Sequence, residues 1–125
     1  MNRVDKIIAC RPNVESKDSI NISNEEKFQN EVLRPILKFQ NNLLLQLFIS
    51  KCEKYKINFS EFNTEEKQEY IEVTLKKDFK LRSLYIGIII AFFTIEEFEK
   101  YSLNEQIYNK RIIQMLIERL KNQTI

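Results

Sequence analysis

The sequence contains no histidine, and this absence removes a large part of enzyme chemistry from consideration. Catalytic triads that use imidazole, zinc sites with histidine ligands and the Glu-x-x-His di-iron sites of helical bundles all lose an essential group. A single glycine, Gly87, likewise excludes Walker-type phosphate loops and the dinucleotide fingerprint, which need several glycines. No catalytic residue, cofactor or metal site is therefore predicted.

The scarcity of glycine and proline also bears on the fold. The 125-residue chain has one glycine and two prolines, whereas β-hairpins need frequent glycine turns and helices avoid both residues. With 43% hydrophobic and 30% charged residues, the chain can build one core of its own. The sequence predicts an all-α protein, an irregular antiparallel bundle of four to five helices formed by residues 24–125. Residues 1–23 are expected to form a short helix, Arg3 to Cys10, and a polar arm that Ile20 and Ile22 anchor.

Neither the charge nor the cysteine content points to a particular partner. Twenty basic and 18 acidic residues leave a net charge of +2, too small to predict nucleic-acid or membrane binding. Cys10 and Cys52 match no zinc or redox spacing and are expected to be reduced thiols. The N-terminus lacks the apolar stretch of a signal peptide, and the longest apolar run, Leu84 to Phe93, is too short to span a membrane. We expect a soluble, cytoplasmic protein in which this run is a buried helix.

The helix starts are clearly marked. Ser23, Thr94 and Ser102 are each followed three residues later by glutamate, the pattern of a capping box. Asn63 is predicted to cap a further helix. The helix after Thr94 is expected to be short and to end at Tyr101, so that Ser102 opens the last helix of the chain.

Pro35 interrupts the first of these helices. Because proline either kinks a helix or opens a new one, we expect a break or a sharp bend near Arg34. From Ile36 to Tyr55 apolar residues cover most of the helix circumference, which is typical of a central helix that touches several neighbours. The helix that follows Asn63 becomes almost wholly apolar toward its end, so its second half is expected to cross the domain centre, with a bend near Asp78.

Six polar residues beside apolar segments form a candidate ligand-binding set: Arg34, Lys38, Gln40, Asn41, Arg82 and Arg111. Gln40 and Asn41 precede a very apolar stretch, so at least one of them is expected to be partly buried, and buried amides need partners. They can bind a ligand in a pocket between helices, with Arg34 or Lys38 recognising an anionic group. Alternatively, they tie the bent backbone at Pro35 to a neighbouring helix.

The other charged residues can be explained by surface ion pairs or by solvation, without a ligand. Arg82 and Arg111 can equally pair with Glu97 or Glu31, or reach water. Two further clusters, one of carboxylates and one of cations, are interpreted as solvated surface. The carboxylates could hold Mg²⁺ and the cations could bind phosphate. They are the carboxylates Glu65, Glu69 and Glu72, and the cations Lys76, Lys77, Lys80 and Arg82. Glu72 lies four residues before Lys76, a spacing that favours a surface ion pair.

Five segments carry a resemblance to a known group of proteins: Leu33–Asn41, Ile86–Ile88, Phe93–Phe98, Arg111–Ile113 and Glu118–Leu120. Over about residues 28–123 the chain resembles small uncharacterised all-helical bacterial proteins, some of which carry the label glyoxalase. A glyoxalase I fold is built from paired βαβββ modules with histidine and glutamate metal ligands. Because this sequence has neither histidine nor a strand pattern, its residues argue against that activity.

Two functions remain as hypotheses. The first is a non-enzymatic module for protein–protein interaction or self-association, because the apolar residues of the two most hydrophobic helices exceed what a small domain readily buries. The second is a small anionic-ligand binder, or an unusual enzyme, with a polar pocket near Arg34 to Asn41.

Overall fold

The computed structural model of the chain describes residues 2–12 and 23–124, and this part is built from α-helices joined by short connections. In chain order the helices are α1 (Arg3–Cys10), α2 (Asn24–Phe28), α3 (Arg34–Lys54), α4 (Thr64–Lys77), α5 (Phe79–Ile90), α6 (Ile95–Leu103) and α7 (Glu105–Thr124). A π-helical turn, η1 (Gln29–Leu33), joins α2 to α3, and a 3₁₀ turn, η2 (Phe59–Glu61), precedes α4. No β-strand occurs in the described ranges, which confirms the predicted all-α class. The predicted polar arm at 13–22, with Ile20 and Ile22, lies outside the described residues.

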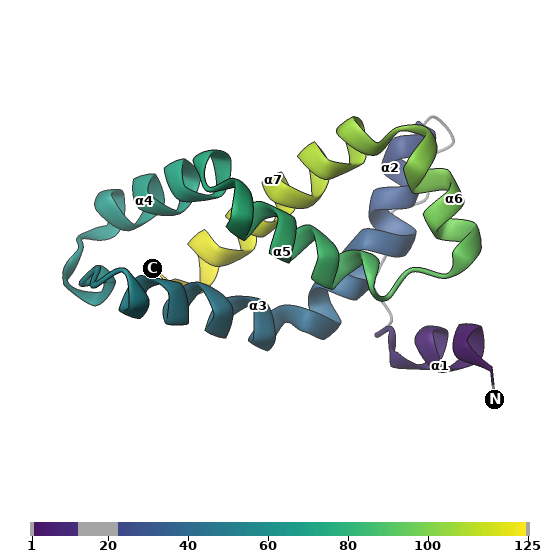
Figure 1. Cartoon of the computed structure of the whole chain (residues 1–125), viewed down its shortest axis with the longest axis horizontal. Helices are drawn as coiled ribbons and strands as arrows, with labels where there is room; N and C mark the ends of the chain where they lie inside the picture. Colours follow the sequence, from purple (N-terminus) through teal and green to yellow (C-terminus); the bar gives the residue numbers. More distant parts are fainter. Residues whose placement is uncertain (1, 13–22, 125) are drawn as a thin grey trace.

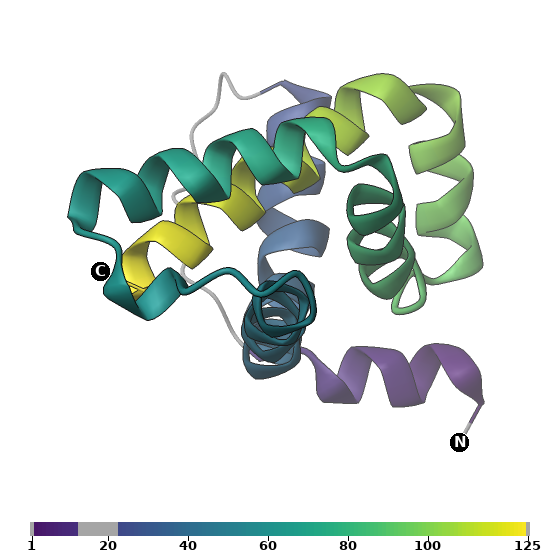
Figure 2. The same cartoon turned by 60° about the vertical axis from the view of Figure 1, so that its left-hand side comes forward.

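The bundle consists of one long bent helix, α2–η1–α3, together with α4, α5, α6 and α7, while α1 lies to one side (Figures 1 and 2). Helix α7 contacts α4, α5 and α6, and it buries residues on several sides. Helix α3 buries a single face, leaving the Phe39 and Leu43 side chains 45% and 53% exposed. The sequence prediction that α3 is the central helix is therefore wrong, since α7 has this place.

The predicted bend at Pro35 is present, but the helix does not break there. Arg34 keeps α-helical angles, φ −62° and ψ −47°, and the chain passes continuously from η1 into α3. Figure 1 shows α2 and α3 pointing in clearly different directions. Proline lacks an N–H and its ring displaces the carbonyl four residues earlier. The wider π turn immediately before Pro35 makes room for the ring, and the helix axis changes direction as a result.

Three of the four predicted helix caps are confirmed. In the complete capping box of α6, the Glu97 amide donates to Thr94 Oγ1 at 3.1 Å and the Thr94 amide donates to Glu97 Oε1 at 2.9 Å. Asn63 caps α4 with the same reciprocal pair of bonds, and Ser23 caps α2 by accepting from the Glu26 amide. These contacts are local in sequence, which is why the sequence reveals them.

The predicted cap at Ser102 is wrong. Ser102 lies inside α6, where its hydroxyl donates to the Glu99 carbonyl at 2.9 Å. A serine hydroxyl can bond a carbonyl one turn earlier, so its hydrogen bond is satisfied without ending the helix. Helix α6 therefore continues past Tyr101 to Leu103, and Asn104, at φ −140° and ψ 48°, separates it from α7.

Thr94 and Ser102 form a matched pair for testing this assignment. We expect Thr94→Ala to lower the free energy of unfolding by about 1 kcal/mol, because the first turn of α6 loses its cap. Ser102→Ala should leave the stability unchanged or slightly raised, since alanine is the better residue inside a helix. Urea unfolding followed by circular dichroism measures both, and equal losses in the two variants would contradict the assignment.

Asp78 separates α4 from α5, as the predicted bend requires. It ends α4 and then caps α5, its Oδ1 accepting from the Leu81 amide at 3.1 Å. In Figure 1 helix α5 lies between α3 and α7, and it contacts both of them and α4. It buries Leu81, Tyr85 and Ile89, whereas Leu84 remains 44% exposed. The predicted buried helix over Leu84 to Phe93 is therefore buried on one side and exposed on the other.

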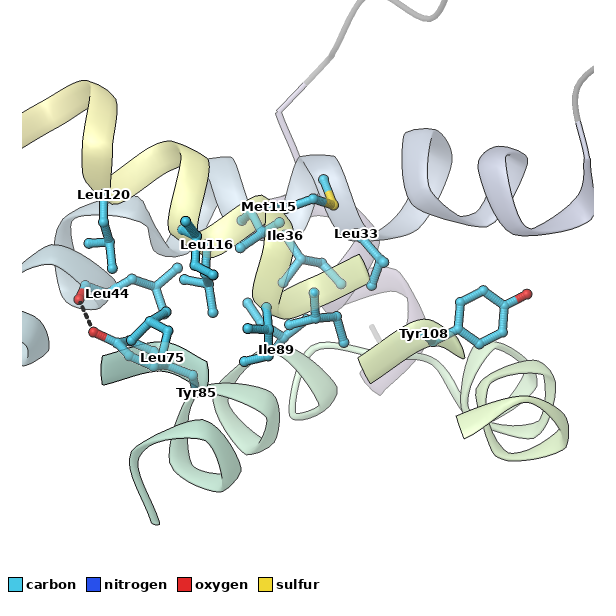
Figure 3. Close-up of a cluster of buried hydrophobic side chains, with 14 of the residues drawn as sticks. Leu33, Ile36, Leu44, Leu75, Tyr85, Ile89, Tyr108, Met115, Leu116 and Leu120 are labelled. Carbon is cyan, nitrogen blue, oxygen red and sulfur yellow. Dashed lines mark hydrogen bonds between the residues drawn. The ribbon is translucent and has the colours of Figure 1, made fainter. Parts of the chain in front are cut away.

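The core fills the space between α3, α4, α5 and α7. Figure 3 shows side chains from these helices pointing toward one another, among them Leu75, Tyr85 and Leu116. Tyr85 is completely buried, and its hydroxyl donates to the Leu44 carbonyl at 3.0 Å. This bond satisfies the phenol in the core and fixes α5 against α3. In the described part of the chain, no helix has the length and apolar character needed to cross a membrane.

Candidate functional site

Three of the six candidate residues meet at one groove between α3 and α7. This α3–α7 groove has a volume of about 520 Å³. Its lining consists of Gln29, Arg34, Lys38, Asn41, Met115, Glu118, Arg119, Asn122 and Gln123. Arg34, Lys38 and Asn41 follow one another at spacings of four and three residues, so helical geometry places them on one face of α3. Met115, Arg119 and Asn122 repeat this spacing on α7.

An amide pair joins the two walls of the groove. Asn41 Nδ2 donates to Gln123 Oε1 at 2.6 Å, and Gln123 Nε2 donates back to Asn41 Oδ1 at 2.9 Å. The same Asn41 oxygen accepts from Arg119 Nη1 at 3.3 Å. Asn41 therefore holds the C-terminal part of α7 against α3 and orients the Arg119 guanidinium. This is the interhelical tie that sequence analysis offered as one alternative, and it does not exclude ligand binding.

The groove brings together three cations that form no ion pair within the described residues. Burial and the neighbouring charge of Arg34 lower the pKa of Arg119 below its ordinary value. The ion pairs within the described ranges are Arg11–Glu97, Lys76–Glu72 and Lys121–Glu72, so Arg34, Lys38 and Arg119 take part in none. Glu118 also lines the groove, where its Oε1 accepts from Gln114 at 3.4 Å. Three cations thus face one carboxylate.

The other three candidate residues lie elsewhere. Gln40 is half-buried, as is Asn41, but it does not line the groove. Arg82 and Arg111 line a separate groove between α4, α5 and α7, of about 530 Å³. The alternative pairing with Glu97 is not formed, because Glu97 binds Arg11. Two weaker contacts are made instead, from Arg82 Nη1 to the Lys76 carbonyl at 3.2 Å and from Arg111 Nη1 to Gln29 Oε1 at 2.8 Å.

Sequence reasoning missed the residues that α7 and η1 contribute. Arg119 and Gln123 lie one helical turn apart beside the apolar stripe of α7, and this spacing is the signal that could have found them. Gln29 offers no comparable signal. It reaches the groove because the π turn and the bend at Pro35 carry it there.

Packing accounts for the Cys52 thiol, and surface ion pairs account for the Glu72 carboxylate. Burial raises the pKa of the Cys52 thiol, and the negative charge of Glu53 raises it further, so Cys52 is a packed and unreactive side chain. Glu72 pairs with Lys76 at 2.9 Å, as predicted, and also with Lys121. Hydrogen bonds from these two lysines hold the Glu72 pKa at about 2. No group of residues suited to hold a metal ion occurs in the part of the chain that the structure describes.

A second surface of functional interest lies on the other side of α3, against α5. The Phe39 and Phe92 rings meet with centroids 5.3 Å apart, and Tyr85 of α5 bonds Leu44 of α3, so the two helices are antiparallel. We define the α3–α5 apolar face by six large side chains and three small residues. The large ones are Phe39, Leu43 and Leu47 on α3, Leu84 and Ile88 on α5, and Phe92 just beyond the end of α5. The small ones are Ser83 and Gly87 on α5 and Ala91 at its C-terminal cap.

The exposure of this face is substantial. Phe39, Leu43 and Leu84 are each 44–53% exposed, while Leu47, Ile88 and Phe92 pack partly against the core. All three small residues are exposed, at spacings of four residues along α5 and its C-terminal cap. The chain from Phe39 to Ser50 contains no charged residue, and neither does the chain from Ser83 to Ile95. Two adjacent helices therefore present an uncharged and largely apolar surface outward.

Three comparisons with known proteins give no family for the chain. No protein-family model matches it, no curated protein matches it, and no solved structure matches it. The resemblance to small bacterial proteins therefore stays a prediction.

Proposed function

We propose that the protein is a homotypic interaction module in which two copies associate through the α3–α5 apolar face. The observation that carries the proposal is that apolar side chains are exposed on two adjacent helices. These helices contain most of the two longest uncharged stretches of the chain, Phe39–Ser50 and Ser83–Ile95. Contiguous exposed apolar patches on soluble proteins commonly mark interaction sites. A helix that served only the fold would be polar on its outer side.

The intramolecular packing does not account for the outer side of α5. Leu81, Tyr85 and Ile89 satisfy the core, and Tyr85 secures α5 to α3. Leu84 and Gly87 point away from that core and are exposed. Serine, leucine or glycine there contributes little to the free energy of folding, whereas lysine or glutamate would serve solubility better. The apolar outer side therefore fits an intermolecular contact.

A second copy of this chain is the occupant that the chemistry of the face favours. A two-fold axis brings the same patch of each copy together, so any charge on it would meet a like charge. The residues of the face itself carry none, and its exposed polar residues on α3, Asn42 and Gln46, are amides. A cation lies only at the edge of the face, where Arg3 of α1 donates to the Ala91 carbonyl at 3.2 Å. An amide both donates and accepts, so it can pair with its own copy. A strongly charged partner would find no complementary charge at the centre of this face.

The small residues of α5 add a geometric reason. Ser83 and Gly87 of α5 and Ala91 at its C-terminal cap lie along one exposed side, between Leu84 and Ile88 on one flank and Ile86 and Ile90 on the other. A row of small side chains between two rows of large ones is a groove into which the ridge of another helix packs. At Gly87 an added Cβ would meet no atom within 4 Å, so its surroundings within the chain are open.

Sedimentation velocity over a concentration series tests the proposal. We expect a reversible monomer–dimer equilibrium for the natural chain, and an increase of at least tenfold in the dimer dissociation constant for Leu84→Glu. Leu103→Glu is the matched control, because Leu103 is 81% exposed but lies at the junction of α6 and α7. Equal dissociation constants for the two variants would contradict the proposal.

A second variant separates association from folding. Gly87→Leu is expected to raise the stability of the monomer by about 0.5–1 kcal/mol, because glycine is a poor helix residue and this site is open. The same change should weaken the dimer, because the larger side chain prevents close approach of a second helix. Thermal unfolding and sedimentation are measured on the same samples. Undiminished dimerisation of Gly87→Leu, or a monomeric natural chain that instead binds lipid vesicles, would overturn the proposal.

A further inference from the structure

The α3–α7 groove has the features of a small-molecule site, and it does not overlap the α3–α5 apolar face. Arg34, Lys38 and Asn41 face α7, while Phe39 and Leu43 lie on the side of α3 that faces α5. The groove volume of about 520 Å³ lies in the range that small-molecule ligands occupy. Its polar lining comes from three elements, η1, α3 and α7, so it forms only when the chain folds.

The charge distribution selects the sign of the ligand. Arg34 is close enough to Arg119 for its charge to oppose protonation of that residue. Arg34 bonds the neutral amide of Asn30 at 3.3 Å, and Arg119 bonds the neutral amide of Asn41. Among the described residues, these two like charges thus lie together without a carboxylate in ion-pair contact, an arrangement that costs free energy until an anion enters.

The guanidinium groups of Arg34 and Arg119 have N–H donors that are available to bind a ligand. An arginine carries five N–H donors, and within the described residues Arg34 and Arg119 each use one of them on a side chain. The planar fork of a guanidinium matches the spacing of two oxygens on a phosphate or carboxylate. Because the Asn41–Gln123 amide pair holds Arg119, part of the ordering that binding requires is already in place.

We propose that the α3–α7 groove binds a doubly charged oxyanion, either inorganic phosphate or the phosphate group of a small phosphomonoester. Arg34 and Arg119 bind its oxygens from the two walls, and Lys38 supplies the third positive charge. The three cations of the groove outnumber its one lining carboxylate, Glu118, so the lining is positively charged. A phosphate with two negative charges offsets more of this positive charge than a monocarboxylate does. Space remains beside the phosphate for the rest of a small molecule.

Titration of the ¹⁵N-labelled full chain with potassium phosphate tests the proposal, with potassium chloride at equal ionic strength and potassium acetate as references. We expect saturable shifts of the Asn41 and Gln123 side-chain amide signals with phosphate and no saturation with chloride or acetate. Arg34→Gln and Arg119→Gln should each weaken phosphate binding at least tenfold. Arg82→Gln is the matched control and should bind as the natural chain does, because Arg82 lines the other groove.

A parallel titration with glycerol 3-phosphate distinguishes the two sources of the anion. Tighter binding than inorganic phosphate assigns the site to phosphomonoesters, and tighter binding of inorganic phosphate assigns it to the free ion. Neither variant is expected to lose stability without ligand, since each removes one of two repelling charges. Should Arg119→Gln unfold, Arg34→Gln still provides the test, because its side-chain bond lies within its own helix. Absence of saturation with both phosphates, or equal weakening in Arg82→Gln, would overturn the proposal.

Discussion

Tyr85→Ala is expected to lower the free energy of unfolding by about 3–5 kcal/mol, one of the two largest effects considered for this fold. Tyr85 is completely buried between α3 and α5, so truncation leaves a cavity that the surrounding helices fill only in part. It also removes the hydroxyl that donates to the Leu44 carbonyl at 3.0 Å. A typical domain is stable by roughly 5–15 kcal/mol, so this loss is a large fraction of the whole.

Two further tyrosine variants separate the contribution of the ring from that of the hydroxyl hydrogen bond. Tyr85→Phe keeps the ring and should cost only about 1 kcal/mol, the usual net value of one buried hydrogen bond. Tyr55→Ala is the control for truncation itself, because Tyr55 is 54% exposed at the end of α3, and it should change little. Urea unfolding followed by circular dichroism measures all three variants. A loss in Tyr85→Ala no greater than in Tyr55→Ala would contradict the described packing.

Glu97→Gln is expected to release α1 from the bundle. The Arg11 and Glu97 side chains are only 9% and 15% exposed, and Arg11 Nη1 donates to Glu97 Oε2 at 2.7 Å. Arg11 also donates to the Phe92 carbonyl at 2.8 Å, so it connects the end of α1 to the segment between α5 and α6. Removing one member of a buried ion pair typically costs about 3–5 kcal/mol, because the other charge is left without a partner. Since α1 lies at the edge, we expect this loss as local opening (Figure 2).

Hydrogen exchange resolved by residue measures this effect. The α1 amides should exchange much faster in Glu97→Gln, while the α7 amides change little. Glutamine can keep the capping role of position 97, so the start of α6 should survive. Glu96→Gln is the control, because Glu96 is exposed on the same turn. Unchanged protection of α1 in Glu97→Gln would show that Arg11 does not hold this helix.

The same pair predicts how the attachment of α1 depends on pH. Burial alone would raise the pKa of Glu97, but the hydrogen bonds from Arg11 and Thr94 outweigh it and leave the pKa below its ordinary value of 4.5. A carboxylate with a depressed pKa in the folded state stabilises that state above its unfolded pKa. The stabilisation is lost as the pH falls through the folded value. Protection of α1 should therefore decline in acid in the natural chain and be low throughout in Glu97→Gln.

The sequence predicts those parts of the fold that depend on local hydrogen bonds. Thr94 and Asn63 find their partners three residues away, so the pattern of residue types is sufficient. Ser102 shows the limit of this reasoning, because the same residue types also fit inside a continuing helix. The sequence predicts too much burial for α5 for a different reason. An apolar run does not reveal whether its surroundings are the core of the same chain or an outer surface.

The candidate site likewise contains residues that the sequence groups together and residues that only the fold brings to them. Arg34, Lys38 and Asn41 share a face of one helix, and helical spacing is enough to group them. Their partners on α7, among them Arg119, are distant in sequence, with Asn41 and Gln123 separated by 82 positions. Only the packing of α7 against α3 brings them together. Arg82 and Arg111 do not line this groove, because they lie along another groove beside α7. Arg111 reaches toward the site only through its hydrogen bond to Gln29.

Association through the α3–α5 apolar face is the central claim, and intermolecular nuclear Overhauser effects test it most directly. A sample that mixes ¹³C-labelled and unlabelled copies reports contacts between copies alone. We predict such contacts from the methyl groups of Leu43, Leu84 and Ile88 to an unlabelled partner. Contacts from a different surface, or none at a concentration where sedimentation shows a dimer, would contradict the claim.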